Sequence, residues 1–138
     1  MKKAIGFNLM ELMIVLVIVG ILTTLTLPLY SNHLVKARRL GAETGLIQLA
    51  SAMERYDLLH STYKGATLDN LNIPETLEDK SYQLVIASVT ANDFVIKAVP
   101  LHSQAEKDVA CGTLLLDSTG KKDITGSARV SDCWENHG

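Results

Sequence analysis

The feature that most constrains this chain is an uninterrupted apolar segment close to its N-terminus. No Asp, Glu, Lys or Arg occurs from Leu12 to Val35, and every residue from Leu12 to Leu22 is apolar. About 18 such residues, as a helix, suffice to cross most of the hydrocarbon core of a bilayer. We therefore expect a hydrophobic transmembrane helix over residues 7–33 and a globular head over residues 34–138.

The overall composition excludes several classes of protein. The 138 residues are 47% hydrophobic but only 5% aromatic, and their formal net charge is −2. A general nucleic-acid binder that relies on counterion release is usually basic. A disordered chain is usually less apolar and more charged than this one. The composition therefore favours one folded domain attached to the apolar segment.

A removable secretory signal peptide is the alternative interpretation of the N-terminus, because Lys2 and Lys3 precede the apolar run. However, no pair of small residues suited to signal cleavage follows the run, which continues as Pro28-Leu-Tyr-Ser-Asn-His33. No cysteine follows it for a lipoprotein anchor either. We expect a retained helix with a cytoplasmic N-terminus, although the cations from Lys36 to Arg39 weaken the charge argument for this orientation.

Glu11 is an unusual residue at the start of this apolar segment. A carboxylate at the centre of a membrane helix costs on the order of 3 kcal/mol on insertion scales. Near the edge of the bilayer, Glu11 would simply mark the interface. We favour the other interpretation, in which Glu11 awaits a cation from a partner.

The residues around Glu11 resemble the prepilin signature of type IV pilins. After the basic leader the chain reads Gly6-Phe-Asn-Leu-Met-Glu11, and the apolar helix follows directly. The resemblance implies a leader over residues 1–6, cleavage between Gly6 and Phe7 by a prepilin peptidase, and N-methylation of Phe7. It also implies that the Phe7 amine of one subunit pairs with Glu11 of its neighbour in the filament. Asn8 and Met10 depart from the residues usual in the family, and neither removes a group that processing needs.

Gly20 and Pro28 also stand at the family's positions within the apolar helix. A proline ring clashes with the preceding turn and removes one helical hydrogen bond. We therefore expect the helix to be kinked, or to loosen in a filament, between Gly20 and Pro28.

The remainder of the chain predicts an α+β head. Apolar residues recur at helical spacing up to about residue 60, and these are Ala42, Leu46, Leu49, Ala50, Met53 and Tyr56. Residues 62–80 contain turn signals. Strands are then expected at residues 82–89, 94–99 and 112–117, with a weaker fourth at 128–131. A helix followed by strands favours a small antiparallel sheet packed against the long helix.

Cys111 and Cys133 are the only cysteines. Outside the inner membrane the compartment is oxidising, which favours a disulfide over two free buried thiols. The ending of the chain is similar to that of PilE-type pilins of Gram-negative bacteria. That resemblance implies a disulfide-closed C-terminal loop exposed on the filament surface.

The sequence contains no recognisable constellation for catalysis, cofactors or metals. The histidines, at positions 33, 60, 102 and 137, are scattered, and no phosphate-binding or nucleophile motif occurs. We therefore expect neither an enzyme nor a cofactor-binding protein.

The sequence thus predicts a structural subunit of a type IV pilus, held in the inner membrane before assembly and extracellular afterwards. Its expected partners are other pilin subunits, and the pilus would support adhesion, twitching motility or DNA uptake. A type II secretion pseudopilin and a periplasmic protein that is anchored but never polymerises are alternatives. Another is a DNA-binding minor pilin that acts as an uptake receptor, with candidate phosphate contacts at Lys121, Lys122 and Arg129.

Overall fold

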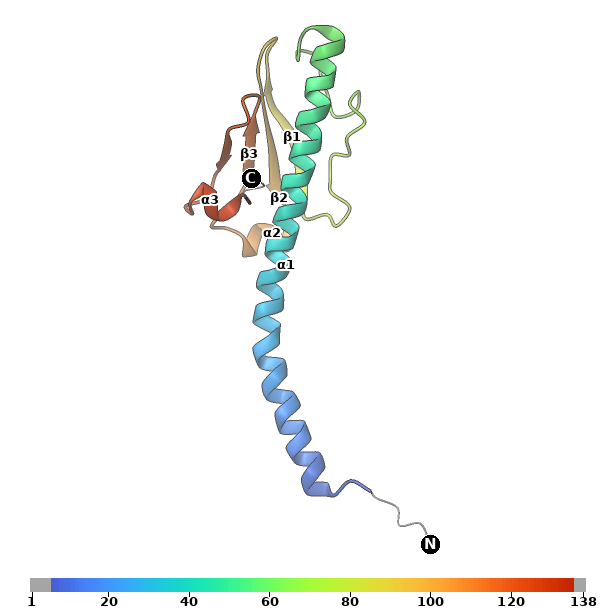
Figure 1. The fold of residues 1–138 in the computed structure, drawn as a ribbon, viewed down its shortest axis with the longest axis vertical. Coiled ribbons are helices and arrows are strands. Elements are labelled where there is room, and N and C mark those ends of the chain that lie inside the picture. Colours follow the sequence, from blue (N-terminus) through green and yellow to red (C-terminus); the bar gives the residue numbers. More distant parts are fainter. Residues whose placement is uncertain (1–5, 136–138) are drawn as a thin grey trace. The chain divides into compact units, whose positions relative to one another are not determined.

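The structure is a computed structural model that describes residues 6–135, so most of the expected leader lies outside the described residues. The chain forms two compact units, the first ending at Leu34 and the second beginning at Val35. Helix α1 (Leu9–His60) belongs to both units (Figure 1).

The first unit consists of the apolar part of α1. The helix is continuous at Gly20 and at Pro28, and every described residue up to Tyr30 is exposed. The hydroxyls of Thr23, Thr24 and Thr26 donate to carbonyls three or four residues earlier in the helix. These hydroxyls therefore have hydrogen-bond partners within the helix itself.

The second unit begins with the remainder of α1, which carries the predicted apolar stripe. Ala42, Leu46, Leu49 and Met53 are fully buried at helical spacing, as the sequence indicated. Gly45 lies on the same face, and a Cβ atom there would stand 3.2 Å from Leu77. The small side chain of Gly45 therefore allows the neighbouring chain to approach the helix closely.

The buried stripe of α1 packs against a four-stranded antiparallel sheet. Its strands are β1 (Tyr82–Val89), β2 (Phe94–Pro100), β3 (Leu114–Asp117) and β4 (Lys122–Ile124), in that spatial order. Alternate residues point into the core, and these are Tyr82, Leu84, Phe94, Ile96, Ala98, Leu114 and Leu116. The predicted α+β class with a small antiparallel sheet is confirmed.

The predicted fourth strand at residues 128–131 is wrong. The fourth strand is β4, and residues 130–133 form the short helix α3 (Val130–Cys133). The carboxylate of Asp117 accepts hydrogen bonds from the backbone N–H groups of Thr119 and Lys121. This tight turn reverses the chain at once, so the next residues pair with β3.

The region after β2 also differs from the expected polar loop, because it contains the helix α2 (His102–Lys107). Strand β2 continues to Pro100, one residue beyond the predicted end, where Pro100 pairs with Tyr82. Strand β3 begins at Leu114, since Gly112 has a φ of +66° and interrupts the extended chain.

Candidate functional site

The first candidate region is the start of α1. Gly6 and Phe7 precede the helix, and the side chain of Phe7 is 76% exposed. Glu11 lies in the first turn, where the helix dipole stabilises a negative charge. Within residues 6–135, the side chain of Glu11 makes no hydrogen bond or ion pair. The carboxylate is therefore available to a cation from outside the described chain.

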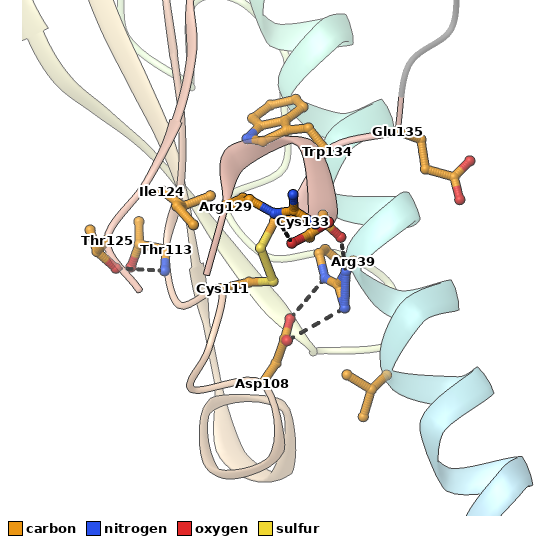
Figure 2. The surroundings of a disulfide bond; sticks show 12 residues. Arg39, Asp108, Cys111, Thr113, Ile124, Thr125, Arg129, Cys133, Trp134 and Glu135 are labelled. Carbon is orange, nitrogen blue, oxygen red and sulfur yellow. Dashed lines mark hydrogen bonds and ion pairs between the residues drawn. A yellow bond between two sulfur atoms is a disulfide. The ribbon is translucent and has the colours of Figure 1, made fainter. Parts of the chain in front are cut away.

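The second candidate region is the C-terminal segment closed by the disulfide (Figure 2). Cys111 and Cys133 are bonded, their Cα atoms are 5.7 Å apart, and both residues are buried. The predicted disulfide is therefore confirmed. Closing a loop of this length contributes roughly 3 kcal/mol in the chain-entropy model. The bond holds the short helix α3 against the turn that precedes β3.

A close approach between two backbone segments supports the disulfide, and the sequence analysis did not find it. The N–H of Gly126 donates to the carbonyl of Cys111 at 3.0 Å, and that of Ala128 donates to Ala110 at 3.0 Å. A Cβ atom on Gly126 would lie 2.0 Å from the carbonyl oxygen of Ala110. Only glycine fits at this position. The only signal in the sequence was an isolated glycine in a polar stretch.

Two of the three cations proposed for DNA contact already have partners within the head. The ammonium of Lys122 lies 5.4 Å from the centre of the Trp134 ring. The indole N–H of Trp134 donates to the carbonyl of Asp123 at 3.0 Å. Arg129 contacts Asp132 at 3.0 Å, and the hydrogen bond with this carboxylate raises the pKa of Arg129. Arg129 nevertheless remains exposed.

Lys121 lies on the turn between β3 and β4. Its backbone N–H donates to the Asp117 carboxylate at 3.0 Å. The hydroxyl of Thr119 donates to the same carboxylate, and this bond, with a smaller contribution from Lys121, lowers the pKa of Asp117. The backbone of the turn is fixed, and the Lys121 side chain is exposed.

A buried network around Arg39 attaches the disulfide-closed segment to α1. The Arg39 Nε lies 3.0 Å from Oδ2 of Asp108, three residues before Cys111. Arg39 Nη1 donates to the carbonyl of Asp132, immediately before Cys133, at 3.5 Å. Figure 2 shows Arg39 reaching from α1 toward Asp108, beside the disulfide. A single guanidinium therefore binds both arms of the closed segment.

The Asp108 carboxylate has further partners inside the head. The Tyr82 hydroxyl donates to it at 3.3 Å, and Nε2 of Gln104 donates to the Tyr82 hydroxyl at 2.9 Å. The same Nε2 lies 3.1 Å from the carbonyl of Val35 on α1. Burial raises the pKa of Tyr82 to about 12. The Tyr82 hydroxyl therefore keeps its proton, and can donate to Asp108, above the pH at which an exposed tyrosine ionises.

Two more side chains of α1 extend this attachment. Lys36 Nζ lies 3.7 Å from the carboxylate of Glu135, and Oε1 of Glu43 accepts the backbone N–H of Glu135 at 3.0 Å. Glu43 is a charged residue, yet it is only 1% exposed. In the sequence, Lys36 and Arg39 stand out only as cations that follow the apolar segment. Periodicity alone does not show that a C-terminal segment will cover this face.

Residues 28–115 match the family model of the type IV minor pilin ComP, DNA uptake sequence receptor. The match covers β1, β2 and α2 together with Arg39 and Asp108, and it ends in β3, before Asp132. The chain belongs to this family of type IV minor pilins. Pilins are structural subunits and not enzymes, and the same holds for this chain as a member of the family.

Relatives of two kinds share parts of this pilin. The chain is 38% identical over 63 residues to the type II secretion system core protein G of Vibrio cholerae, covering 46% of this chain and 43% of that protein. It is 55% identical over 38 residues to fimbrial protein EcpB of Eikenella corrodens, covering 28% of this chain and 24% of that protein. These matches span less than half the length of the relatives.

The fold is shared with a crystal structure of the Neisseria meningitidis non-core minor pilin PilV. The TM-score is 0.58 at 21% identity, and the match covers 70% of this chain and 92% of that chain. At this identity the likeness establishes the pilin fold and nothing about partners.

Proposed function

We propose that this pilin is made as a prepilin, anchored in the inner membrane by α1, and then assembled into a type IV pilus. The single observation that carries the proposal is the exposed apolar part of α1 with one unpartnered carboxylate, Glu11, in its first turn. The helix is long and apolar enough to cross a membrane. The same apolar surface suits a bundle of subunit helices, where packing rather than hydrophobic transfer guides association.

Processing follows from the same residues. Cleavage between Gly6 and Phe7 by a prepilin peptidase would leave the helix in the membrane and create an amine four residues before Glu11. Methylated Phe7 of one subunit would then neutralise Glu11 of its neighbour. Breaking such a pair in apolar surroundings is costly, so the pair would set the register of assembly.

The mass of the intact chain, in sheared filaments and in membranes, tests this proposal. We expect a chain that begins at methylated Phe7, carries the Cys111–Cys133 bond and occurs in the filament fraction. A Glu11→Gln variant should be processed and yet be lost from filaments. A chain that still begins at Met1, or a Glu11→Gln variant that assembles normally, contradicts the proposal.

Loosening of α1 between Gly20 and Pro28 is part of the proposed assembly. Pro28 has no N–H, so the carbonyl of Thr24 lacks its ordinary helical donor. A density map of the filament that shows a regular helix through both residues would contradict this loosening. It would not contradict the proposed assembly.

The similarity to core protein G supports an alternative, in which this chain is a pseudopilin and assembles in a type II secretion system. The two assemblies are distinguished by the genetic requirement for incorporation. Loss of the pilus motor should remove this chain from the filament fraction, whereas loss of the secretion system should not. The opposite result would favour the pseudopilin.

The description of the matched family supports DNA uptake as a second candidate function. In this chain, Lys121, Lys122 and Arg129 are the proposed phosphate contacts. We expect a Lys121→Gln/Lys122→Gln variant to assemble normally but to bind and take up less DNA. If both DNA uptake and DNA affinity are unchanged, Lys121 and Lys122 do not contact DNA.

A further inference from the structure

Lys122 and its neighbour Lys121 differ in where their side chains lie. Lys122 is the first residue of β4 and pairs with Leu116 of β3, which is buried in the core. Residues that pair directly across two strands point to the same face of the sheet. Lys122 therefore points to the core side at the edge of the sheet, whereas Lys121 lies on the preceding turn with its side chain exposed.

At this edge the Lys122 ammonium lies over the indole of Trp134, 5.4 Å from the centre of the ring. An aromatic face attracts a cation, and the face of tryptophan does so most strongly. Within the described residues 6–135, the ammonium has no hydrogen-bond or ion-pair partner. The aromatic face therefore restrains the charge and leaves its three N–H donors available to an acceptor from outside the chain.

The indole itself is held in place by several contacts. Its N–H donates to the carbonyl of Asp123, the residue after Lys122, at 3.0 Å. The backbone N–H of Trp134 donates to the carbonyl of Val130 at 2.9 Å, and the preceding residue is Cys133 of the disulfide. Trp134 is only 3% exposed, and Figure 2 shows it at the end of α3. The ring is therefore a rigid support for Lys122.

A supported cation binds an anion at a lower entropic cost than a mobile one. A lysine side chain that is free in solvent gives up rotamer freedom when it contacts a phosphate. Contact with Trp134 already restricts the rotamers of Lys122, so less freedom is lost on binding. Duplex DNA presents a regular row of phosphates, and each contact with a lysine adds to the affinity. Lys122 is therefore better prepared for a phosphate than Lys121 is.

We propose that Trp134 is a positioning residue for DNA binding, because it holds the Lys122 ammonium where a backbone phosphate of duplex DNA can accept its hydrogen bonds. The inference rests on the DNA uptake proposed above. It assigns a part in that function to a buried residue that acts only through Lys122. The disulfide contributes indirectly, because it fixes Cys133 beside Trp134.

The DNA affinity of single and combined variants tests this role. Fluorescence anisotropy measures it with a short labelled duplex and the full chain in a nonionic detergent. Trp134→Leu removes the aromatic face and should weaken binding about two- to fivefold. Trp134→Phe keeps an aromatic face and should bind more tightly than Trp134→Leu. The effect of Trp134→Leu should persist in a Lys121→Gln background and disappear in a Lys122→Gln background.

The emission of Trp134 provides a second measurement, which needs no DNA. Trp134 is the only tryptophan in the chain, so the emission reports on this ring alone. Lys122→Gln removes the cation over the ring and should change the emission spectrum. Lys121→Gln is the matched control and should leave the spectrum unchanged.

The positioning role is overturned if Trp134→Leu binds DNA as tightly as the parent chain. It is also overturned if Trp134→Leu weakens binding equally in the Lys122→Gln background, since the ring would then act on the fold in general. An emission spectrum that does not respond to Lys122→Gln would exclude the contact itself. Failure of the proposed DNA function looks different: the parent chain then binds no duplex, and the positioning role fails with it, although the emission still responds to Lys122→Gln.

Discussion

Arg39 and Asp108 form a buried ion pair between α1 and the disulfide-closed segment, with Nε and Oδ2 separated by 3.0 Å and side chains only 14% and 6% exposed. Since Arg39 also binds the carbonyl of Asp132, one residue of the helix fixes both approaches to the disulfide. We therefore expect the contacts of Arg39 and the Cys111–Cys133 disulfide to stabilise each other.

Removal of Arg39 should be strongly destabilising. Arg39→Gln leaves the Asp108 charge buried without its cation, which costs about 3 kcal/mol or more. Urea unfolding of the full chain in detergent measures the loss. Arg38→Gln is the matched control, because Arg38 reaches only the Ser103 hydroxyl, at 3.3 Å. Equal losses for the two variants would contradict a special role for Arg39.

The Arg39 pair should also favour disulfide formation. In a glutathione buffer, two cysteine thiols and oxidised glutathione give the Cys111–Cys133 bond and two reduced glutathiones. By linkage, a contact that the disulfide strengthens must strengthen the disulfide equally. Thiol trapping should show a weaker tendency to oxidise in Arg39→Gln than in Arg38→Gln. An identical equilibrium constant in both would refute the coupling.

Gly126 should tolerate no side chain. Gly126→Ala forces the Cβ into the carbonyl of Ala110, so the two backbone segments must separate, at a cost on the order of 3 kcal/mol. Thermal unfolding measures the effect. Gly41→Ala is the control, because nothing lies within 4 Å of its Cβ position and alanine favours the helix. A Gly126→Ala variant as stable as the parent would show that the approach is not tight.

Stability should fall at alkaline pH through Tyr82. Burial raises the pKa of Tyr82 from the ordinary value of 10.0 to about 12 in the folded protein. Above pH 10 the unfolded chain loses this proton while the folded chain retains it, so stability declines as the pH rises toward 12. The contribution lost is about 2 to 3 kcal/mol. Tyr82→Phe should flatten this part of the pH profile, and an unchanged profile would exclude Tyr82 as its source.

If Lys121 and Lys122 contact DNA phosphates, their removal should change the salt dependence of binding. Each phosphate contact contributes about 0.9 to the slope of log affinity against log salt concentration. The Lys121→Gln/Lys122→Gln variant should therefore lower the slope by about 1.8. Fluorescence anisotropy over a salt series measures this slope. Lys64→Gln serves as the control, and an equal reduction there would indicate a nonspecific charge effect.

Local patterns in the sequence predict the long helix, its buried stripe, three of the four strands and the cysteine pair. Each of these depends on local periodicity or on the identity of a few residues. An uncharged apolar run favours a helix wherever it lies, and alternating apolar residues favour a strand before any partner is known.

The roles of other residues depend on which distant segments pack against them in the folded head. Glu43 lies outside the apolar stripe of the helical pattern. It is nevertheless buried, and its carboxylate accepts the backbone N–H of Glu135. Arg39 is one of the cations that follow the apolar segment, yet it binds the carboxylate of Asp108 and the carbonyl of Asp132. Gly126 is required because Ala110 approaches it from a distant part of the chain. Contacts between distant segments leave no periodic trace in either segment, so no local pattern could reveal these roles.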